Sequence, residues 1–391
     1  MYSIILAKAK RKEDCMTIVL PIGITSFKEI RQNGAYYVDK TMFLHDLLGA
    51  RVKVTLITRP RRFGKSLMLS TLDEFFSNRN SREKTEKLFD GLAIMEQKAI
   101  VEAHMGQYPV MHFSFNGVDG ANYDSLMNNI LRAMQKWCRR NRLLFDFDKC
   151  DQYDVELFDR IRKGTSNEKY KEPENGKLLM QSDMESFLDT MISMLVDTYG
   201  KKVVVLLDEY DVPLAKASLF KGALKVGEEL VTPYDAMKKF IASLFGPALK
   251  DNDEYLERAV VTGCMRIAQA SIFTGINNFS WYGIQRYQYS EAFGFTPQEV
   301  KKLLYDAGIS ERESDFREWY DGYVFGNAEI YCPWDVLEQA AHLIGHPGGN
   351  MESHWLGTSG NEILRMMLSN PKMNIEEEIS GLLEGDLLLL W

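Results

Sequence analysis

Gly64, Lys65 and Ser66 follow the β-rich run Val52–Thr58 and open the amphipathic stretch Ser66–Phe76. A strand, a loop and a helix in that order place backbone N–H groups and the positive end of a helix dipole where an anion can bind. In such a loop a glycine lets the backbone approach phosphate closely, a lysine reaches the terminal phosphates, and a serine offers a hydroxyl to Mg²⁺. The residues expected to contact phosphate are Pro60, Arg61, Arg62, Phe63, Gly64, Lys65 and Ser66.

The loop departs from the full phosphate-loop pattern, G-x-x-x-x-G-K-[ST], because Arg59 stands in place of the first glycine. A Gly-Lys-Ser tripeptide at a helix start also occurs by chance, so this segment alone leaves a purely structural role open. Its position between a β-rich run and an amphipathic helix favours phosphate binding.

A second segment, Val203–Leu207, consists of five aliphatic residues followed by Asp208 and Glu209. An unbroken aliphatic run is typical of a strand buried on both faces. In P-loop ATPases such a strand delivers an aspartate to the Mg²⁺ shell, and the glutamate after it polarises the attacking water. Solvated acids at a strand end are the alternative, but both segments in one chain favour a nucleotide site. We expect Ser66 and Asp208 as metal ligands and Glu209 as a catalytic residue.

A third strand is expected at Ala259–Thr262, followed by Gly263. In the sheet order usual for this class, it lies between the phosphate-loop strand and the Asp208–Glu209 strand. Thr262 could then sense the γ-phosphate, and Arg266 could stabilise charge in cis or in trans. An ordinary strand-end threonine and a surface arginine are the alternative.

The elements around these segments alternate between strand and helix, which predicts a parallel α/β sheet with helices on both faces. Further elements are expected in the strand Tyr108–Phe115, the helix Tyr123–Trp137, and a helix Met184–Tyr199 opened by a Ser182–Glu185 capping box and closed by Gly200. The polar stretch Phe147–Lys177 reads as an exposed excursion.

The pattern changes at Thr296, Pro297 and Glu299, which supply an N-cap, an N1 proline and an N3 carboxylate. Short helices rich in aromatic residues follow. We therefore expect a boundary near residues 288–296, with a leader at 1–19, a nucleotide-binding domain at 20–290, and a small helical or winged-helix domain at 291–391.

Composition excludes several classes of protein. With 391 residues, 45% of them hydrophobic and 26% charged, the chain is long enough for a full core. The net charge of −8 gives no bulk attraction for nucleic acid or anionic membranes. Five scattered cysteines form no zinc or disulfide pattern, and no apolar run approaches the roughly 18 residues of a membrane span. We expect a cytoplasmic protein.

Taken together, these residues resemble the predicted AAA-ATPase (AAA-ATPase-like) family of bacterial proteins, relatives of the archaeal-type and STAND-like P-loop ATPases. The stretches similar to that family, spread over roughly residues 20–360, are 20–27 (Leu-Pro-Ile-Gly-Ile-Thr-Ser-Phe), 37–41 (Tyr-Val-Asp-Lys-Thr), 59–66 (Arg-Pro-Arg-Arg-Phe-Gly-Lys-Ser), 207–214 (Leu-Asp-Glu-Tyr-Asp-Val-Pro-Leu), 262–263 with 266–268, 271–273 with 277–278, 293–296 and 319–323.

The resemblance implies that Arg59 belongs to the loop, because the loop of this family has the sequence Arg-Pro-Arg-Arg-Phe-Gly-Lys. It implies that Arg61 and Arg62 add charge at the phosphates, and it leaves Tyr37–Lys40 either on the adenine side or in structural packing. Longer members carry a nuclease-like domain. No Asp…Glu-x-Lys arrangement follows residue 300 here, so we expect a truncated member without nuclease activity.

The sequence thus predicts a protein that binds ATP with Mg²⁺ and hydrolyses it to drive or reset a conformational switch. A nucleotide sensor with little turnover and a scaffold with a vestigial site are the alternatives. The expected partners are a nucleotide and either another protein or a second copy of the chain, with no membrane and no nucleic acid evident.

Overall fold

The structure is a computed structural model that describes residues 18–164, 181–226, 229–252, 254–265, 273 and 279–354. The chain divides into two compact units, residues 1–352 and 353–391, and of the second only Ser353 and His354 are described. Nearly all of the expected leader at 1–19 lies outside the described residues. No helix within the described ranges has the length and apolar character needed to cross a membrane.

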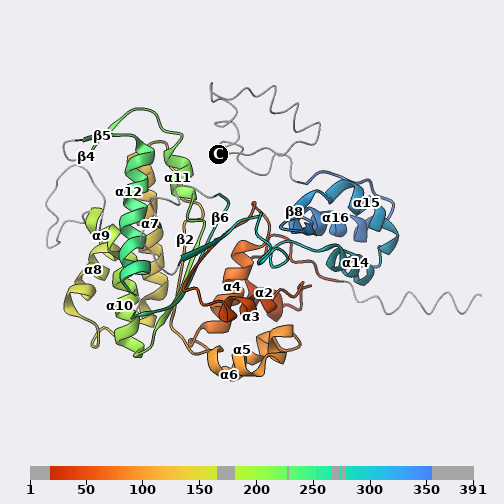
Figure 1. Cartoon of the computed structure of the whole chain (residues 1–391), viewed down its shortest axis with the longest axis horizontal. Coiled ribbons are helices and arrows are strands. Elements are labelled where there is room, and N and C mark those ends of the chain that lie inside the picture. The colour runs from red at the N-terminus through yellow and green to blue at the C-terminus, as the bar shows by residue number, and fades with distance from the viewer. Residues whose placement is uncertain are drawn as a thin grey trace, which may run out of the picture. The chain divides into compact units, whose positions relative to one another are not determined.

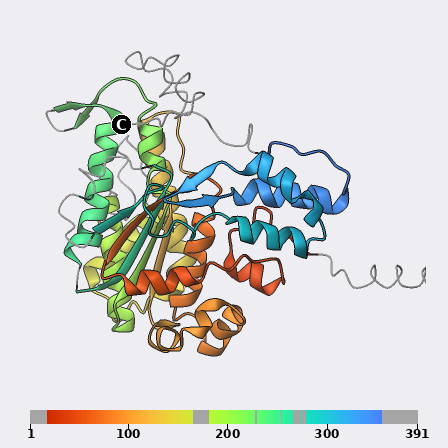
Figure 2. The ribbon, with the colours of Figure 1, turned by 45° about the vertical axis from the view of Figure 1, so that its right-hand side comes forward.

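A five-stranded parallel sheet forms the centre of the first unit (Figures 1 and 2). Its strands lie in the order β2 (Val110–Ser114), β3 (Val203–Asp208), β6 (Leu256–Gly263), β1 (Val54–Thr58) and β7 (Phe279–Tyr282). Every neighbouring pair is parallel. The expected α/β sheet is confirmed, and so is the position of the strand ending at Gly263 between the other two site strands.

The two faces of the sheet are covered by different helices because successive strand residues point to opposite sides. On β3, Val203, Val205 and Leu207 join one apolar cluster, and Val204 and Leu206 join another. The first cluster is built with α7 (Tyr123–Asn141), α8 (Gln152–Lys163), α9 (Gln181–Glu185), α10 (Phe187–Tyr199), α11 (Val212–Ala217), α12 (Pro233–Gly246) and η3 (Pro247–Asp251). The second is built with α2 (Phe27–Gln32), α3 (Met42–Gly49), α4 (Lys65–Phe76), α5 (Arg82–Phe89), η1 (Ala93–Glu96) and α6 (Lys98–His104). All six residues of β3 are buried, as the aliphatic run predicts.

A third apolar cluster holds the elements after residue 295 together, with side chains such as Leu303, Phe316 and Val336 fully buried. Its elements are α14 (Pro297–Asp306), η4 (Ser310–Arg312), α15 (Glu313–Tyr320), the antiparallel pair β8 (Tyr323–Phe325) and β9 (Ala328–Ile330), and α16 (Pro333–Gly345). The capping box of α14 is confirmed: Thr296 Oγ1 accepts from Glu299 N, and Thr296 N donates to Glu299 Oε2.

Two local predictions differ from the structure. The helix expected at Met184–Tyr199 is divided into α9 and α10, and Ser182 lies inside α9 rather than capping it, although Gly200 does end α10 with a φ of 61°. The excursion expected at 147–177 contains α8, whose residues Leu157, Phe158 and Ile161 are buried. These three apolar positions lie on one face of the helix and pack into the first cluster. Residues 165–180 lie outside the described ranges.

The remaining elements are short: η2 (Arg142–Leu144) and the antiparallel strands β4 (Leu224–Val226) and β5 (Glu229–Val231).

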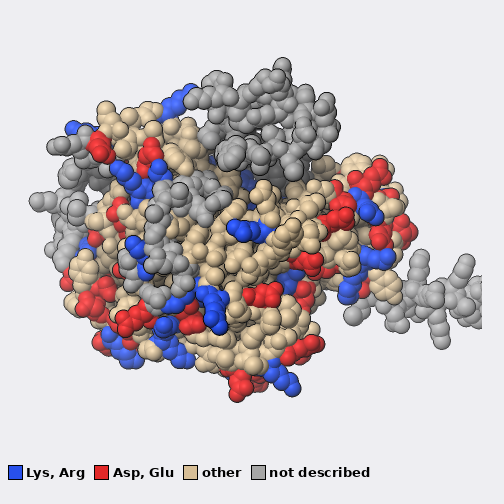
Figure 3. Space-filling model, viewed as in Figure 1, with Lys and Arg blue, Asp and Glu red and all other residues tan. Residues whose placement is uncertain are grey.

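The surface carries side chains of both charges. On the face seen in Figure 3, acidic and basic side chains of the described residues alternate over the surface. This mixture fits the modest net charge of −8.

Replacing Asp154 with asparagine is expected to stabilise the protein at pH 8 and to have little effect at pH 5. Burial, reinforced by Asp151, Asp197 and Asp189, raises the pKa of the Asp154 carboxyl from 3.8 to about 6. A carboxyl whose pKa is higher in the folded than in the unfolded state opposes folding once pH exceeds the folded pKa. Because Asp154 is partly exposed, solvent screening reduces the effect of this pKa shift on stability. We expect the melting temperature of Asp154→Asn at pH 8 to be higher than that of the parent by roughly 2–4 °C.

Thermal unfolding at both pH values tests this, with Asp159→Asn on the same helix as the control. Asp159 is paired with Lys163 and Arg162, and these partners overcome burial and lower its pKa. Its substitution should therefore lower the melting temperature at pH 8. Equal effects of Asp154→Asn at the two pH values would contradict the prediction.

Candidate functional site

The turn between β1 and α4 ends in a left-handed glycine at the start of a helix that no side chain caps. Gly64 precedes the first helical residue, Lys65, with a φ of 82°, and no side chain caps the helix. Glycine adopts this left-handed conformation without the steric cost that a Cβ imposes. The first N–H groups of α4 therefore remain available to a ligand at the positive end of the helix dipole.

Lys65 is buried, with 7% of its surface exposed, and its ammonium lies against the loop. Nζ donates to the carbonyl oxygens of Arg59 at 2.9 Å and Pro60 at 2.8 Å, and it lies 3.4 Å from Cys264 Sγ. These contacts join the loop to Cys264, the first residue after β6. The expected phosphate-loop lysine and the expected sensor segment are therefore neighbours.

Asp208 brings three segments together at the carboxyl ends of adjacent strands. Ser66 Oγ donates to Asp208 Oδ2 at 2.5 Å, and Thr262 Oγ1 donates to Asp208 Oδ1 at 2.6 Å. Asp208 and Thr262 are both buried, with exposed fractions of 3% and 0%. A hydroxyl and a carboxylate at hydrogen-bonding distance are the oxygen donors that Mg²⁺ prefers, so Ser66 and Asp208 fit the role of protein ligands beside phosphate oxygens.

Glu209 leaves the strand end in an unusual backbone conformation, with a φ of 55°. Its side chain is half-buried. Burial and the neighbouring Asp208 and Asp211 raise the pKa of its carboxyl, while Lys65 and Arg61 lower it, and the net direction is upward. A raised pKa brings a carboxylate closer to the range in which a general base works at neutral pH.

Positive φ angles at non-glycine residues gather around this site. Within the described ranges they occur at Arg62, Glu209 and Tyr289. The first two belong to the loop and the strand end, and the carbonyl of Tyr289 accepts a bond from Arg59 NH2 at 2.8 Å. Such conformations cost about 1–3 kcal/mol each and cluster at functional sites.

The two arginines expected at the phosphates lie in different surroundings. Arg61 is exposed, and its charge acts on Glu209 and Cys264. The Arg62 guanidinium instead stacks on Trp334, the second residue of α16, with 3.8 Å between Cζ and the ring centroid. The charge of Arg61 therefore acts on Glu209, and the Arg62 guanidinium packs on α16.

Arg59 and Phe63 tie the loop to later parts of the chain. The buried guanidinium of Arg59 donates to the carbonyl oxygens of Thr58, Tyr282 and Tyr289 at 2.8–2.9 Å. Burial lowers its pKa to about 10, so it stays charged at neutral pH. Phe63 is fully buried against the rings of Tyr323 and Phe325, with centroids 4.8 and 5.2 Å apart. The arginine in place of the first loop glycine thus connects the loop to the backbone of Tyr282 and Tyr289.

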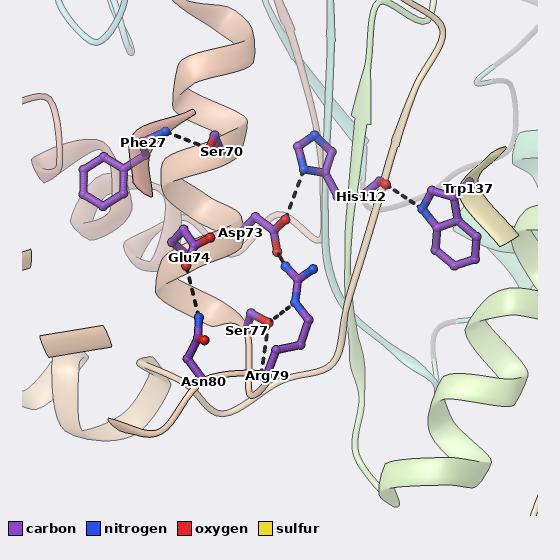
Figure 4. A network of polar contacts seen from close by, with 9 residues as sticks. All are labelled: Phe27, Ser70, Asp73, Glu74, Ser77, Arg79, Asn80, His112 and Trp137. Atoms are coloured by element: carbon purple, nitrogen blue, oxygen red, sulfur yellow. Dashed lines mark hydrogen bonds and ion pairs between the residues drawn. The ribbon is translucent and has the colours of Figure 1, made fainter. Parts of the chain in front are cut away.

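The helix that follows the loop is anchored at its far end by a polar network (Figure 4). Asp73 on α4 accepts from Arg79 and lies 3.2 Å from His112 Nδ1 on β2, and the His112 carbonyl accepts from Trp137 Nε1 at 2.7 Å. Burial opposes ionisation of Asp73, but His112 and Arg79 outweigh it and hold its pKa below the ordinary value. The network fixes α4 to the sheet and to α7.

Two further expectations have separate outcomes. Arg266 lies outside the described residues. Asp39 and Lys40 make structural contacts: Asp39 accepts from Thr41 and from Ala93 N, and Lys40 pairs with Glu299 at 2.6 Å. These contacts favour the structural-packing alternative for that segment.

Comparison with known proteins identifies the family of this chain. Residues 21–273 match the model of a family described as "Predicted AAA-ATPase", which includes the loop, the Asp208–Glu209 strand end and Thr262. The chain belongs to this family. The chain is also 28% identical over 330 residues to a protein of Azotobacter chroococcum mcd 1 described as "Uncharacterized protein in vnfD 5'region". That alignment covers 81% of this chain and 51% of the relative, so the chain spans about half of that protein's length. No solved structure matches the predicted AAA-ATPase significantly.

Some site residues of this predicted AAA-ATPase could not be assigned roles from its sequence. Trp334, Tyr323 and Phe325 meet the loop through contacts between segments more than 250 positions apart, which no local pattern reveals. Asp211 lies two residues beyond Glu209 in a stretch that resembles the family, and that position was the only available signal for it.

Proposed function

We propose that this chain binds ATP with Mg²⁺ through the loop Pro60–Ser66 and hydrolyses it. The observation that supports this best is that the hydroxyls of Ser66 and Thr262 both donate to the buried carboxylate of Asp208, at the edge of the sheet where β1, β3 and β6 end. Membership of the predicted AAA-ATPase family supports nucleotide binding independently.

Each residue has a distinct role in this proposal. Lys65 binds the terminal phosphates, Thr262 contacts the γ-phosphate, and Arg61 contributes charge on the same side. Ser66 and Asp208 hold the metal ion, which when bound neutralises phosphate charge. Glu209 accepts a proton from, or orients, the attacking water. Arg266 stays an expected charge-stabilising residue.

We further propose that ATP acts on the elements after residue 295. The loop residues Arg62 and Phe63 contact Trp334 and the β8–β9 pair. A ligand that reorders the loop changes the environment of these aromatic side chains, and this supports a conformational switch rather than turnover alone.

The finer expectations from the sequence belong to the same proposal. They are a domain boundary near 288–296, a winged-helix character of the later elements, a relation to archaeal-type and STAND-like ATPases, and action on a protein partner or a second copy. Cys138, Cys150, Cys264 and Cys332 are free thiols, which supports a reducing, cytoplasmic location.

Calorimetric titration with ATP in the presence and absence of Mg²⁺, together with phosphate release, tests the function. Metal-dependent binding and release are expected. Binding without release, alone or with candidate partners, would favour a nucleotide sensor. Absence of binding by the folded chain would favour a scaffold with a vestigial site.

Trp334→Ala is expected to uncouple the later elements from the nucleotide. The contact with Arg62 contributes on the order of 1 kcal/mol at a half-buried position. In the parent protein, Mg²⁺-ATP should slow hydrogen exchange in residues 323–345. In the variant this slowing should be reduced while ATP affinity changes by only a few-fold.

Trp319→Ala provides a matched control, because Trp319 lies on α15 and is 51% exposed. It should leave the exchange response intact. A response in Trp334→Ala equal to that of the parent would show that the nucleotide does not act through this contact.

A further inference from the structure

Asp211 occupies the N-cap position of α11 but does not cap that helix. An aspartate at an N-cap usually accepts from the second or third N–H group of its own helix. Here Asp211 Oδ2 accepts instead from the backbone N–H groups of Cys264 and Met265, each at 2.9 Å, beyond the end of β6. Its carboxylate therefore bonds to the neighbouring loop.

This carboxylate is placed where a charge is costly. Asp211 is 3% exposed, and Oδ1 has no hydrogen-bond partner within the described residues. Burial raises the pKa of the carboxyl, while the N–H groups of Cys264, Met265 and Asp211 itself, together with the charge of Lys65, act in the opposite direction. A buried polar group that lacks a partner costs about 1–3 kcal/mol, which stability alone does not explain.

The residue opposite leaves just enough room for the carboxylate. A Cβ on Gly263 would lie 2.7 Å from Asp211 Oδ1 and 2.6 Å from Tyr210 Cε1. Only glycine permits the end of β6 to approach Tyr210 and Asp211, which follow β3, so closely. The end of β6 at Gly263 therefore packs directly against Tyr210 and Asp211.

The turn that Asp211 binds contacts the phosphate-binding residues on both sides. Thr262, immediately before Gly263, donates to Asp208. Cys264, whose N–H donates to Asp211, lies with its sulfur 3.4 Å from Lys65 Nζ. A shift of this turn would therefore displace Thr262 and Lys65 together.

We propose that Asp211 is a positioning residue of the ATP site, which holds the turn Gly263–Met265 so that Thr262 and Lys65 keep the geometry needed for phosphoryl transfer. The inference rests on the proposed ATPase function. Asp211 acts through these neighbours and does not contact the reacting atoms. Small displacements of positioned groups reduce rates more than they reduce affinity.

Asp211→Ala is expected to lower kcat for ATP about tenfold or more while KM changes by only a few-fold. Asp211→Asn keeps an oxygen that accepts both N–H bonds and should restore most of the rate. Asp151→Ala is the control, because Asp151 is an N-cap aspartate that caps α8 through Tyr153 N. It should leave kcat unchanged. A role limited to stability would lower the melting temperature without this selective loss and rescue of kcat.

A second readout needs no nucleotide. Asp211 raises the pKa of the Cys264 thiol by its charge, so the reference is Asp211→Asn, which lacks that charge but keeps an acceptor oxygen. Alkylation of Cys264 by iodoacetamide, followed by peptide mass spectrometry, should be several-fold faster in Asp211→Ala than in Asp211→Asn, with Cys150 as an internal reference. If the alanine variant does not fold, Asp211→Leu fills a similar volume without an acceptor and takes its place.

The outcomes separate the two proposals. A parent protein that neither binds nor hydrolyses ATP overturns the proposed function, and Cys264 alkylation then still decides whether Asp211 holds the turn. A parental kcat in Asp211→Ala, or equal rates of Cys264 alkylation in Asp211→Ala and Asp211→Asn, overturns the positioning role.

Discussion

Glu209→Gln should reduce the ATP turnover number by about 10²–10⁴ while the Kd for Mg²⁺-ATP changes by only a few-fold. Glutamine keeps the size of the side chain and most of its hydrogen bonding but cannot accept a proton. Asp208 and Ser66, which we expect to hold the metal ion, are untouched. Asp208→Asn should in contrast weaken Mg²⁺-dependent binding as well.

The pH dependence of turnover gives this prediction a second readout. Burial raises the Glu209 pKa, so the parent should lose turnover on acidification at a pH above the ordinary range of a glutamate. In Glu209→Gln the residual rate should not follow that profile. Phosphate release and calorimetry measure the rate and the affinity, and Glu102→Gln on the exposed side of α6 is the control. Parental turnover in Glu209→Gln would place the base elsewhere.

The sheet and the central site were predictable because they depend on local pattern. Five aliphatic residues before Asp208 require burial on both faces, and parallel strands place their carboxyl ends along one edge. Asp208 therefore meets Ser66 and Thr262 as the order of the strands predicts. The positive φ of Glu209 has no signature in the sequence, because glutamate is not a residue type that favours this conformation.

The parts that could not be predicted depend on tertiary contacts. The sequence predicts phosphate contacts for residues 60–66, yet the side chains of Arg62 and Phe63 pack against elements after residue 295. Arg59 satisfies three carbonyls, and Phe63 completes an aromatic cluster with β8. Arg62 could as well have extended toward an anion, and the ring of Trp334 decides its direction. Similarly, the sequence did not predict α8 as a helix, because its polar residues outnumber the three residues that it buries.

This separation gives the loop two faces with different tasks. In the proposed function the backbone N–H groups, Lys65 and Arg61 bind the anion, while Arg59, Arg62 and Phe63 pack against other parts of the chain. A substitution on the anion side should therefore change affinity directly. One on the packing side should change the response of the later elements, as proposed for Trp334.

Lys65→Ala is expected to weaken Mg²⁺-ATP binding about ten- to a hundredfold. A charge-assisted hydrogen bond contributes about 1.5–3 kcal/mol, and each 1.4 kcal/mol is a factor of ten in Kd. Lys65 is buried in the loop at the start of α4, where its ammonium is held against the Arg59 and Pro60 carbonyls. Calorimetric titration of the folded variant measures the change.

Lys98→Ala on the exposed start of α6 is the control for loss of one positive charge, and it should bind ATP as the parent does. A melting temperature measured for each variant separates lost binding from lost folding, because alanine leaves the Arg59 and Pro60 carbonyls without their partner. Parental affinity in a folded Lys65→Ala protein would remove the loop Pro60–Ser66 as the phosphate site. A weakened but still Mg²⁺-dependent affinity would instead agree with a metal ion held by Ser66 and Asp208, since the substitution leaves both in place.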